Sequence, residues 1–366
     1  MIPSQRIPLY IRACFLFIGI YLFIYTLIIG REILIPIAYA FIVSIVLSPF
    51  VSFLVRKKVN RIAAISIAVL ISFFLTLGLI YFIASQLSMF NNALPVMKDK
   101  VHILQEQATQ WIATHFYFSI EKIDAWFGNA KSGLYSSQDG MIGKTLGTIS
   151  GILILVFLIP VYVFMILYYE PLLLVFSKKL FDKSNHQKLE EVLIQTKAII
   201  QNYLIGLLIE AIIVGTLNSI ALLVIGIEYA ILIGIIGALF NMIPLVGGIF
   251  AGIIALVITV LTKGSSYYVL LVLLSYACIQ FFDTHYITPR IVASKVKINA
   301  LIAVIVVLIG NAIWGIPGMF LALPVTGILK VIFEHIETLK PWAFLLGDEM
   351  PASGILIFRF SKKKSK

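Results

Sequence analysis

The chain has 366 residues, of which 61% are hydrophobic and only 12% are charged, and its mean hydropathy is +1.04. Soluble domains carry about 25% charged residues, so this composition excludes an ordinary soluble protein and indicates an integral membrane protein. The formal net charge of +11 does not point to nucleic acid, because the basic residues cluster at the ends of apolar segments, where they flank membrane spans. The expected partner is the lipid bilayer, with no nucleic acid.

The amino-terminal region, residues 1–85, contains three apolar runs of the length that crosses a bilayer as a helix, at 10–30, 33–55 and 62–85. Ala38-Tyr39-Ala40 is typical of a signal-peptidase site, which leaves a cleaved signal as an alternative. The preceding apolar run is too long for a signal, however, and Arg31 and Glu32 interrupt it. We therefore predict an uncleaved first span with a tight turn at residues 30–32.

Basic residues predict the orientation, because loops rich in Lys and Arg stay in the cytoplasm. Such residues precede the first span and join the second to the third (Arg6, Arg12, Arg56, Lys57, Lys58 and Arg61). Residues 86–145 have no basic excess and are predicted to form an extracytoplasmic amphipathic arm. The arm would lie on the membrane surface or pack against a neighbour, with a binding role as the alternative. Residues 341–366 are predicted to be a basic cytoplasmic tail, so both termini would be cytoplasmic.

The transport core is predicted at residues 146–340, with full spans at 149–169, 203–225 and 267–282. Two longer apolar segments, 229–262 and 298–333, contain Pro244 and Pro317, and an interior proline costs a helix about 3 kcal/mol. Each proline leaves arms that are short for a crossing of about 20 residues. The predicted fold is an all-α integral membrane protein with about six full spans plus two oppositely oriented helical hairpins, which makes eight hydrophobic segments. Two long tilted spans are disfavoured, because they would place the basic loop at 290–297 outside.

A midplane site is predicted at the tips of the two hairpins. Irregular backbone at membrane depth is tolerated where it is buried in protein or lines a cavity, and paired broken segments indicate a transporter's binding site. The predicted residues for binding a small polar solute are Asn241, Pro244, Gly247, Gly248, Asn311, Gly315, Pro317 and Gly318. The alternative is that these Gly and Pro residues are kinks and close-packing points, which are common in membrane helices.

Glu210 lies deep inside the span 203–225, where a carboxylate is costly and indicates a functional site by default. It shares one helix face with Asn202 and Gly206, at steps of four residues. We predict that Glu210 carries a coupling proton or cation, with Gln280 and Asp283 as further candidates. The alternatives are a neutral contact between helices for Glu210 and solvation at the membrane interface for Asp283.

Catalytic motifs are missing from the sequence. The five histidines are scattered, no His-Glu-x-x-His or Gly-x-Ser-x-Gly occurs, and Gly143-Lys144-Thr145 lacks the glycine that a phosphate loop needs at position 138. We therefore expect no enzyme, no ATP-driven pump, no cofactor and no bound metal. A secondary transporter is favoured over a non-transporting membrane scaffold and over a membrane-embedded enzyme.

The carboxyl-terminal half contains "NYLIG", "IPLVGG", "QFFDTHYITPRIVASKVKINAL" and "LIGNAIWGIPGMFLALPVTGILK". These segments resemble the autoinducer-2 exporter-like transporter family, and the resemblance extends from about Tyr10 to Asp348. It implies a multi-pass permease of the bacterial inner membrane that exports a small polar solute, or else a cation/proton antiporter, and it is compatible with a homo-oligomer. Two departures from the family pattern are Gly248, where many relatives have proline, and Asn299-Ala300, where many have His-Pro. The landmarks that match by position are Pro244, Gly247, Pro289, Gly315, Pro317 and Gly318.

Overall fold

The computed structural model describes residues 8–116, 119, 125, 141–242, 247–293 and 297–348. Pro244, the tail beyond Asp348 and much of the expected arm therefore lie outside the described residues. The predicted all-α membrane fold is confirmed. The described segments form helices and short connections with one isolated bridge between Ile298 and Gly347, and six of the helices are long and apolar enough to cross a membrane.

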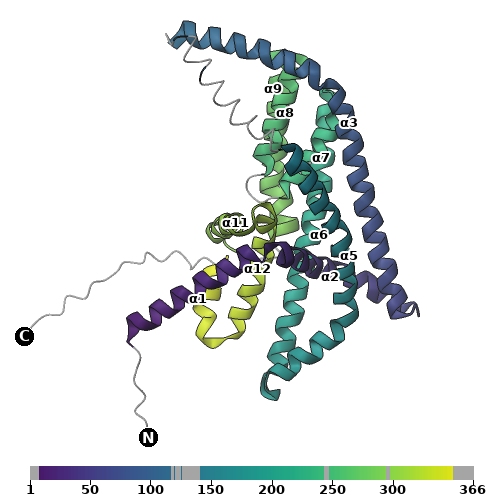
Figure 1. The fold of residues 1–366 in the computed structure, drawn as a ribbon, viewed down its shortest axis with the longest axis vertical. Coiled ribbons are helices and arrows are strands. Elements are labelled where there is room, and N and C mark those ends of the chain that lie inside the picture. Colours follow the sequence, from purple (N-terminus) through teal and green to yellow (C-terminus); the bar gives the residue numbers. More distant parts are fainter. Residues whose placement is uncertain are drawn as a thin grey trace, which may run out of the picture.

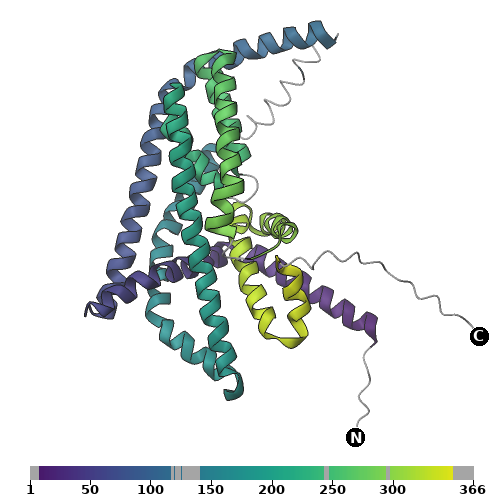
Figure 2. The ribbon, with the colours of Figure 1, turned by 180° about the vertical axis from the view of Figure 1, so that it is seen from behind.

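The amino-terminal part consists of α1 (Leu9–Ile29), α2 (Arg31–Arg56), α3 (Arg61–Phe116) and α5 (Met141–Leu180). Figures 1 and 2 show α3 as a long helix that bends towards its carboxyl end, so the start of the expected arm continues the third span. Helices α2, α3 and α5 pack around a buried cluster in which alanines allow a close approach, namely Ala40, Val51, Ala64, Ile65, Ala68, Val69, Val163 and Leu167.

The connection between α1 and α2 differs from the predicted tight turn. Gly30 has φ −77° and ψ 4°, close to helical values, and its N–H donates to the Thr26 carbonyl at 2.8 Å. The N–H of Leu34 in turn donates to the Gly30 carbonyl at 2.8 Å. The prediction of a tight turn was wrong, because i to i−4 hydrogen bonding continues through Gly30 and the chain bends there without reversing (Figure 1).

The core begins with η1 (Lys183–Asn185) and the long helix α6 (His186–Ile225), which packs against α7, α9 and α12. After α9 (Ser266–Phe282), two π-helical turns follow, η2 (Asp283–Ile287) and η3 (Pro289–Ala293). The chain then forms α11 and α12 and closes with η4 (Glu337–Leu339) and α13 (Lys340–Leu346). Helix α6 therefore provides a common surface for α7, α9, η3 and α12.

The first broken segment forms α7 (Ala230–Asn241) and α8 (Gly247–Lys263), which pack against each other. The rings of Phe240 and Phe250 stack with centroids 6.1 Å apart. Farther from the tip, a buried cluster joins residues of both helices (Ala230, Ile233, Ala251, Ala255 and Ile258). The pairing of late α7 residues with early α8 residues makes the two helices antiparallel, as a hairpin requires.

The second broken segment forms α11 (Ala300–Trp314) and α12 (Ile316–His335). The Lys330 ammonium donates to the Lys297 carbonyl at 3.1 Å, which brings the base of α12 beside the start of α11, as in an antiparallel pair. The break was predicted at Pro317 but lies at Gly315, whose φ of 64° and ψ of −142° are accessible essentially to glycine alone. Pro317 instead occupies the first turn of α12, where its missing N–H costs no hydrogen bond.

Candidate functional site

Two buried carboxyl groups meet beside the end of the first hairpin. Glu210 on α6 is 5% exposed and Asp283 at the end of α9 is 3% exposed. The Thr288 hydroxyl lies 2.8 Å from Glu210 Oε1 and 3.3 Å from Asp283 Oδ1. The Asn241 amide nitrogen lies 3.0 Å from Asp283 Oδ2 and 3.4 Å from Glu210 Oε1. The same two polar side chains therefore contact both carboxyl groups.

Helix irregularities position three of these four side chains. Asn241 is the last residue of α7, and Asp283 stands where α9 changes from α-helical to π-helical hydrogen bonding. Thr288 connects the two π-helical turns, directly before Pro289. π-Helical turns are rare in proteins, and those that do occur are often found at functional sites. The wider turn brings the Thr288 hydroxyl within reach of both Glu210 and Asp283.

A small polar cavity adjoins this carboxyl pair through Asn241. Its volume is about 10 Å³, and its lining also includes Asn218, Gly248, Tyr276 and Gln280. The Asn218 Oδ1 and Tyr276 hydroxyl oxygen atoms are buried and have no hydrogen-bond partner among the described residues. A polar cavity of this size accommodates about one water molecule. In this conformation it is too small for an organic solute.

The glycines of the first tip have different neighbours. A Cβ atom on Gly247 would overlap the Phe240 backbone carbonyl, so the absence of a side chain lets the two arms of the hairpin meet. A Cβ atom on Gly248 would instead overlap the tip of the Gln280 side chain, which covers this glycine inside the small cavity. The packing alternative therefore suits Gly247, whereas Gly248 contacts a coupling candidate.

The second tip makes packing contacts. Gly318 lies against the backbone carbonyl of Gly310, and neither position has room for a Cβ atom. The Tyr39 hydroxyl of α2 donates to the Pro317 carbonyl at 3.4 Å, and the Trp314 indole N–H donates to the Leu27 carbonyl of α1 at 2.8 Å. These contacts tie the tip to α2 through the Pro317 carbonyl and to α1 through the Trp314 side chain.

Not all the predicted site residues come together. The structure joins Glu210, Asn241 and Asp283 in one cluster, and it places Gly248 and Gln280 at the adjoining cavity. No hydrogen bond in the described part of the chain connects the second tip to this cluster, and Asn311 is exposed. Pro244 lies outside the described residues.

Thr288, Asn218 and Tyr276 were not among the residues predicted from the sequence. A signal for Asn218 was available, because it continues the face of Asn202, Gly206 and Glu210 in further steps of four residues. Thr288 and Tyr276 show no such periodic relation to the other site residues in the sequence, and only the three-dimensional packing of α6, α9 and η2 brings them beside those polar groups.

Comparison with known proteins supports the assignment of this chain as a membrane transport protein. The family model described as "AI-2E family transporter" matches residues 14–338. The chain is 24% identical over 323 residues to the AI-2 transport protein TqsA of Escherichia coli (strain K12), covering 87% of this chain and 90% of that protein. It is 23% identical over 318 residues to YueF of Bacillus subtilis (strain 168), covering 83% and 84%. This match over nearly the whole chain, together with six apolar helices long enough to cross a membrane, shows that the chain belongs to the AI-2E transporter family of multi-pass bacterial membrane proteins.

Proposed function

We propose that the protein is an ion-coupled secondary transporter in which Glu210 and Asp283 together bind the coupling proton or cation. The observation that carries this proposal is the sharing of Asn241 and Thr288 by two buried carboxyl groups. Because like charges repel, two neighbouring carboxyl groups hold a proton or a cation between them more readily than one alone. Carboxyl groups at membrane depth are otherwise costly and are typical of proton and ion pathways.

Asn241 links ion binding to the solute pathway in this proposal. Its amide contacts both carboxyl groups, and the same side chain lines the small cavity with Asn218 and Tyr276. Binding or release of a charge at the carboxyl pair changes which hydrogen bonds Asn241 makes. The end of α7 then shifts relative to α9, and the cavity changes size.

The proposed cargo is a small polar solute, and the proposed direction is export. The orphan polar atoms of Asn218 and Tyr276, with the Gln280 amide, supply both donors and acceptors for such a solute. The relative named as an AI-2 transport protein supports a small solute of this kind. Since the cavity holds about one water molecule, solute binding requires α7 and α8 to move away from α9.

The test is coupled flux in proteoliposomes that contain a pH-sensitive dye. Glu210→Gln and Asp283→Asn should each abolish proton or cation movement and any solute accumulation driven by it. Glu228→Gln is the matched control, because Glu228 is an exposed carboxylate outside this cluster. Unchanged ion dependence in both cluster variants would refute the coupling role, and the lack of any flux in the wild-type protein would favour a membrane scaffold.

A further inference from the structure

A second, larger cavity lies among α2, α3 and α5, away from the carboxyl pair. Its volume is about 190 Å³, and its lining is almost entirely apolar: Val43, Leu47, Val69, Ser72, Phe73, Thr76, Val156, Ile159, Pro160 and Val163. The hydroxyl group of Thr76 is already bonded to the Ser72 carbonyl at 2.9 Å. Apolar cavities of about 150 Å³ remain dry and accept hydrocarbon guests. The chemistry of this cavity therefore suits a hydrocarbon.

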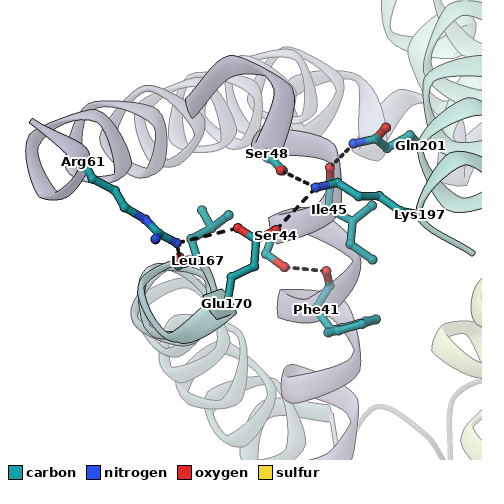
Figure 3. Close-up of polar contacts among 9 residues, drawn as sticks. All are labelled: Phe41, Ser44, Ile45, Ser48, Arg61, Leu167, Glu170, Lys197 and Gln201. Carbon is teal, nitrogen blue, oxygen red and sulfur yellow. Dashed lines mark hydrogen bonds and ion pairs between the residues drawn. The ribbon is translucent and has the colours of Figure 1, made fainter. Parts of the chain in front are cut away.

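A polar cluster, shown in Figure 3, lies near the residues that line this cavity. There the Arg61 guanidinium contacts Glu170 at 3.7 Å and the Leu167 carbonyl at 2.9 Å. The Lys197 ammonium contacts Glu170 at 3.4 Å and the Ser48 hydroxyl at 2.8 Å. Ser48 directly follows the cavity residue Leu47, and Leu167 lies one helical turn beyond Val163. Along α2 and α5, the charged cluster therefore begins within about one helical turn of residues that line the cavity.

The cluster has donors available for an anion. Both Arg61 contacts use the Nη2 atom of a guanidinium that carries five N–H donors, and the Arg61 side chain is 42% exposed. Lys197 is exposed to the same extent. Further exposed basic residues precede Arg61, namely Arg56 at the end of α2 and Lys57 and Lys58 in the short α2–α3 connection. Glu170 neutralises only part of this charge, and an arginine fork matches the geometry of a phosphate group.

We propose that this cavity and cluster together bind one anionic phospholipid. One acyl chain occupies the apolar cavity among α2, α3 and α5, and the phosphate of the head group contacts Arg61 and Lys197. A lipid satisfies both halves of the site at once, because its hydrocarbon chain and its charged phosphate are joined in the order that the cavity and cluster require. The lipid would thereby connect the amino-terminal helices to α6, the helix that carries both Lys197 and Glu210.

Native mass spectrometry of the full-length protein tests this proposal. The protein in detergent is titrated with phosphatidylglycerol or phosphatidylcholine of identical acyl chains. We expect one tightly retained phosphatidylglycerol per chain and about fivefold weaker retention in Arg61→Gln, since one basic group near an anionic lipid changes affinity by about that factor. Lys179→Gln is the control, because Lys179 is an exposed cation on the same helix as Glu170 and should leave retention unchanged.

Filling the cavity tests its role separately. Ser72→Phe should remove the retained lipid, whereas Leu75→Phe, at a highly exposed position of the same helix, should not. Thermal melts without added lipid check the fold, and if Ser72→Phe melts early, the milder Thr76→Leu replaces it. Equal retention of the two lipids, or undiminished retention in the cavity-filling variant, would overturn the proposal. A change in the oligomeric state of Ser72→Phe without a change in the amount of retained lipid would also overturn it, because that result would identify a second copy of the chain as the occupant of the cavity.

Discussion

The adjacent glycines Gly247 and Gly248 provide a matched pair of substitutions. A Cβ atom at position 247 would lie 1.8 Å from the Phe240 carbonyl oxygen and 2.5 Å from the Asn241 Cα atom, whereas ordinary contact begins at 3.4 Å, so the start of α8 and the end of α7 must separate by about 1.6 Å. If Asn241 takes up this movement along the direction of its contact with Asp283, the 3.0 Å contact lengthens to about 4.6 Å, beyond hydrogen-bonding distance. At position 248 the new Cβ atom displaces only the tip of the exposed Gln280 side chain.

Gly247→Ala should therefore lower the free energy of unfolding by about 1–3 kcal/mol, the usual cost of overpacking, and should also reduce ion-coupled flux. Gly248→Ala should change stability by less than about 0.5 kcal/mol, as substitutions that displace a mobile surface group do. Unfolding in mixed micelles, followed by circular dichroism, gives the stability, and the proteoliposome assay gives the flux. Equal stability and flux in Gly247→Ala and the wild-type protein would refute the assignment of Gly247 as the contact that positions Asn241.

Four further substitutions test the fold and the site. Thr288→Val should weaken ion-coupled flux severalfold, since the Thr288 hydroxyl contacts both carboxyl groups. The control Thr284→Val should leave the flux unchanged, and equal effects of the two substitutions in flux assays would contradict the role of Thr288. Gly315→Ala should cost about 1–3 kcal/mol of stability through backbone strain alone, because its Cβ atom would meet no neighbour; a melt unchanged from wild type would contradict this. Pro317→Ala should retain stability and transport, because the helix break lies at the preceding glycine, and a large loss of either would restore the proline as the cause of the break. Asn299→Ala should destabilise the protein by about 1–2 kcal/mol in the same melts, because its side chain caps α11 and contacts the carbonyl groups at the end of α13; a neutral result would exclude this capping role.

The sequence predicted the helices well, because the bilayer leaves few choices. Apolar runs of about 20 residues must satisfy their own backbone hydrogen bonds in hydrocarbon and therefore become helices. The expected runs at 62–85, 203–225 and 267–282 lie within α3, α6 and α9. Both broken segments also formed two helices each. The break of the second hairpin was predicted at Pro317 because proline disrupts helices. The actual break at Gly315 depends on a positive φ, which the sequence does not reveal beyond the presence of a glycine.

The sequence by itself determined the membrane setting, the helical fold and the presence of costly carboxyl groups in apolar surroundings. Only the tertiary structure decided which of those polar groups meet. Glu210, Asn241, Asp283 and Thr288 come from three separate segments, and their meeting depends on how α6, α7 and α9 pack and on a π-helical turn. Hydrophobic periodicity specifies which face of a helix is buried, but it does not specify the rotation and axial position of one helix against another. Those are set by local contacts, such as Gly247 against Phe240 and Gly318 against Gly310, that exist only once the helices have packed.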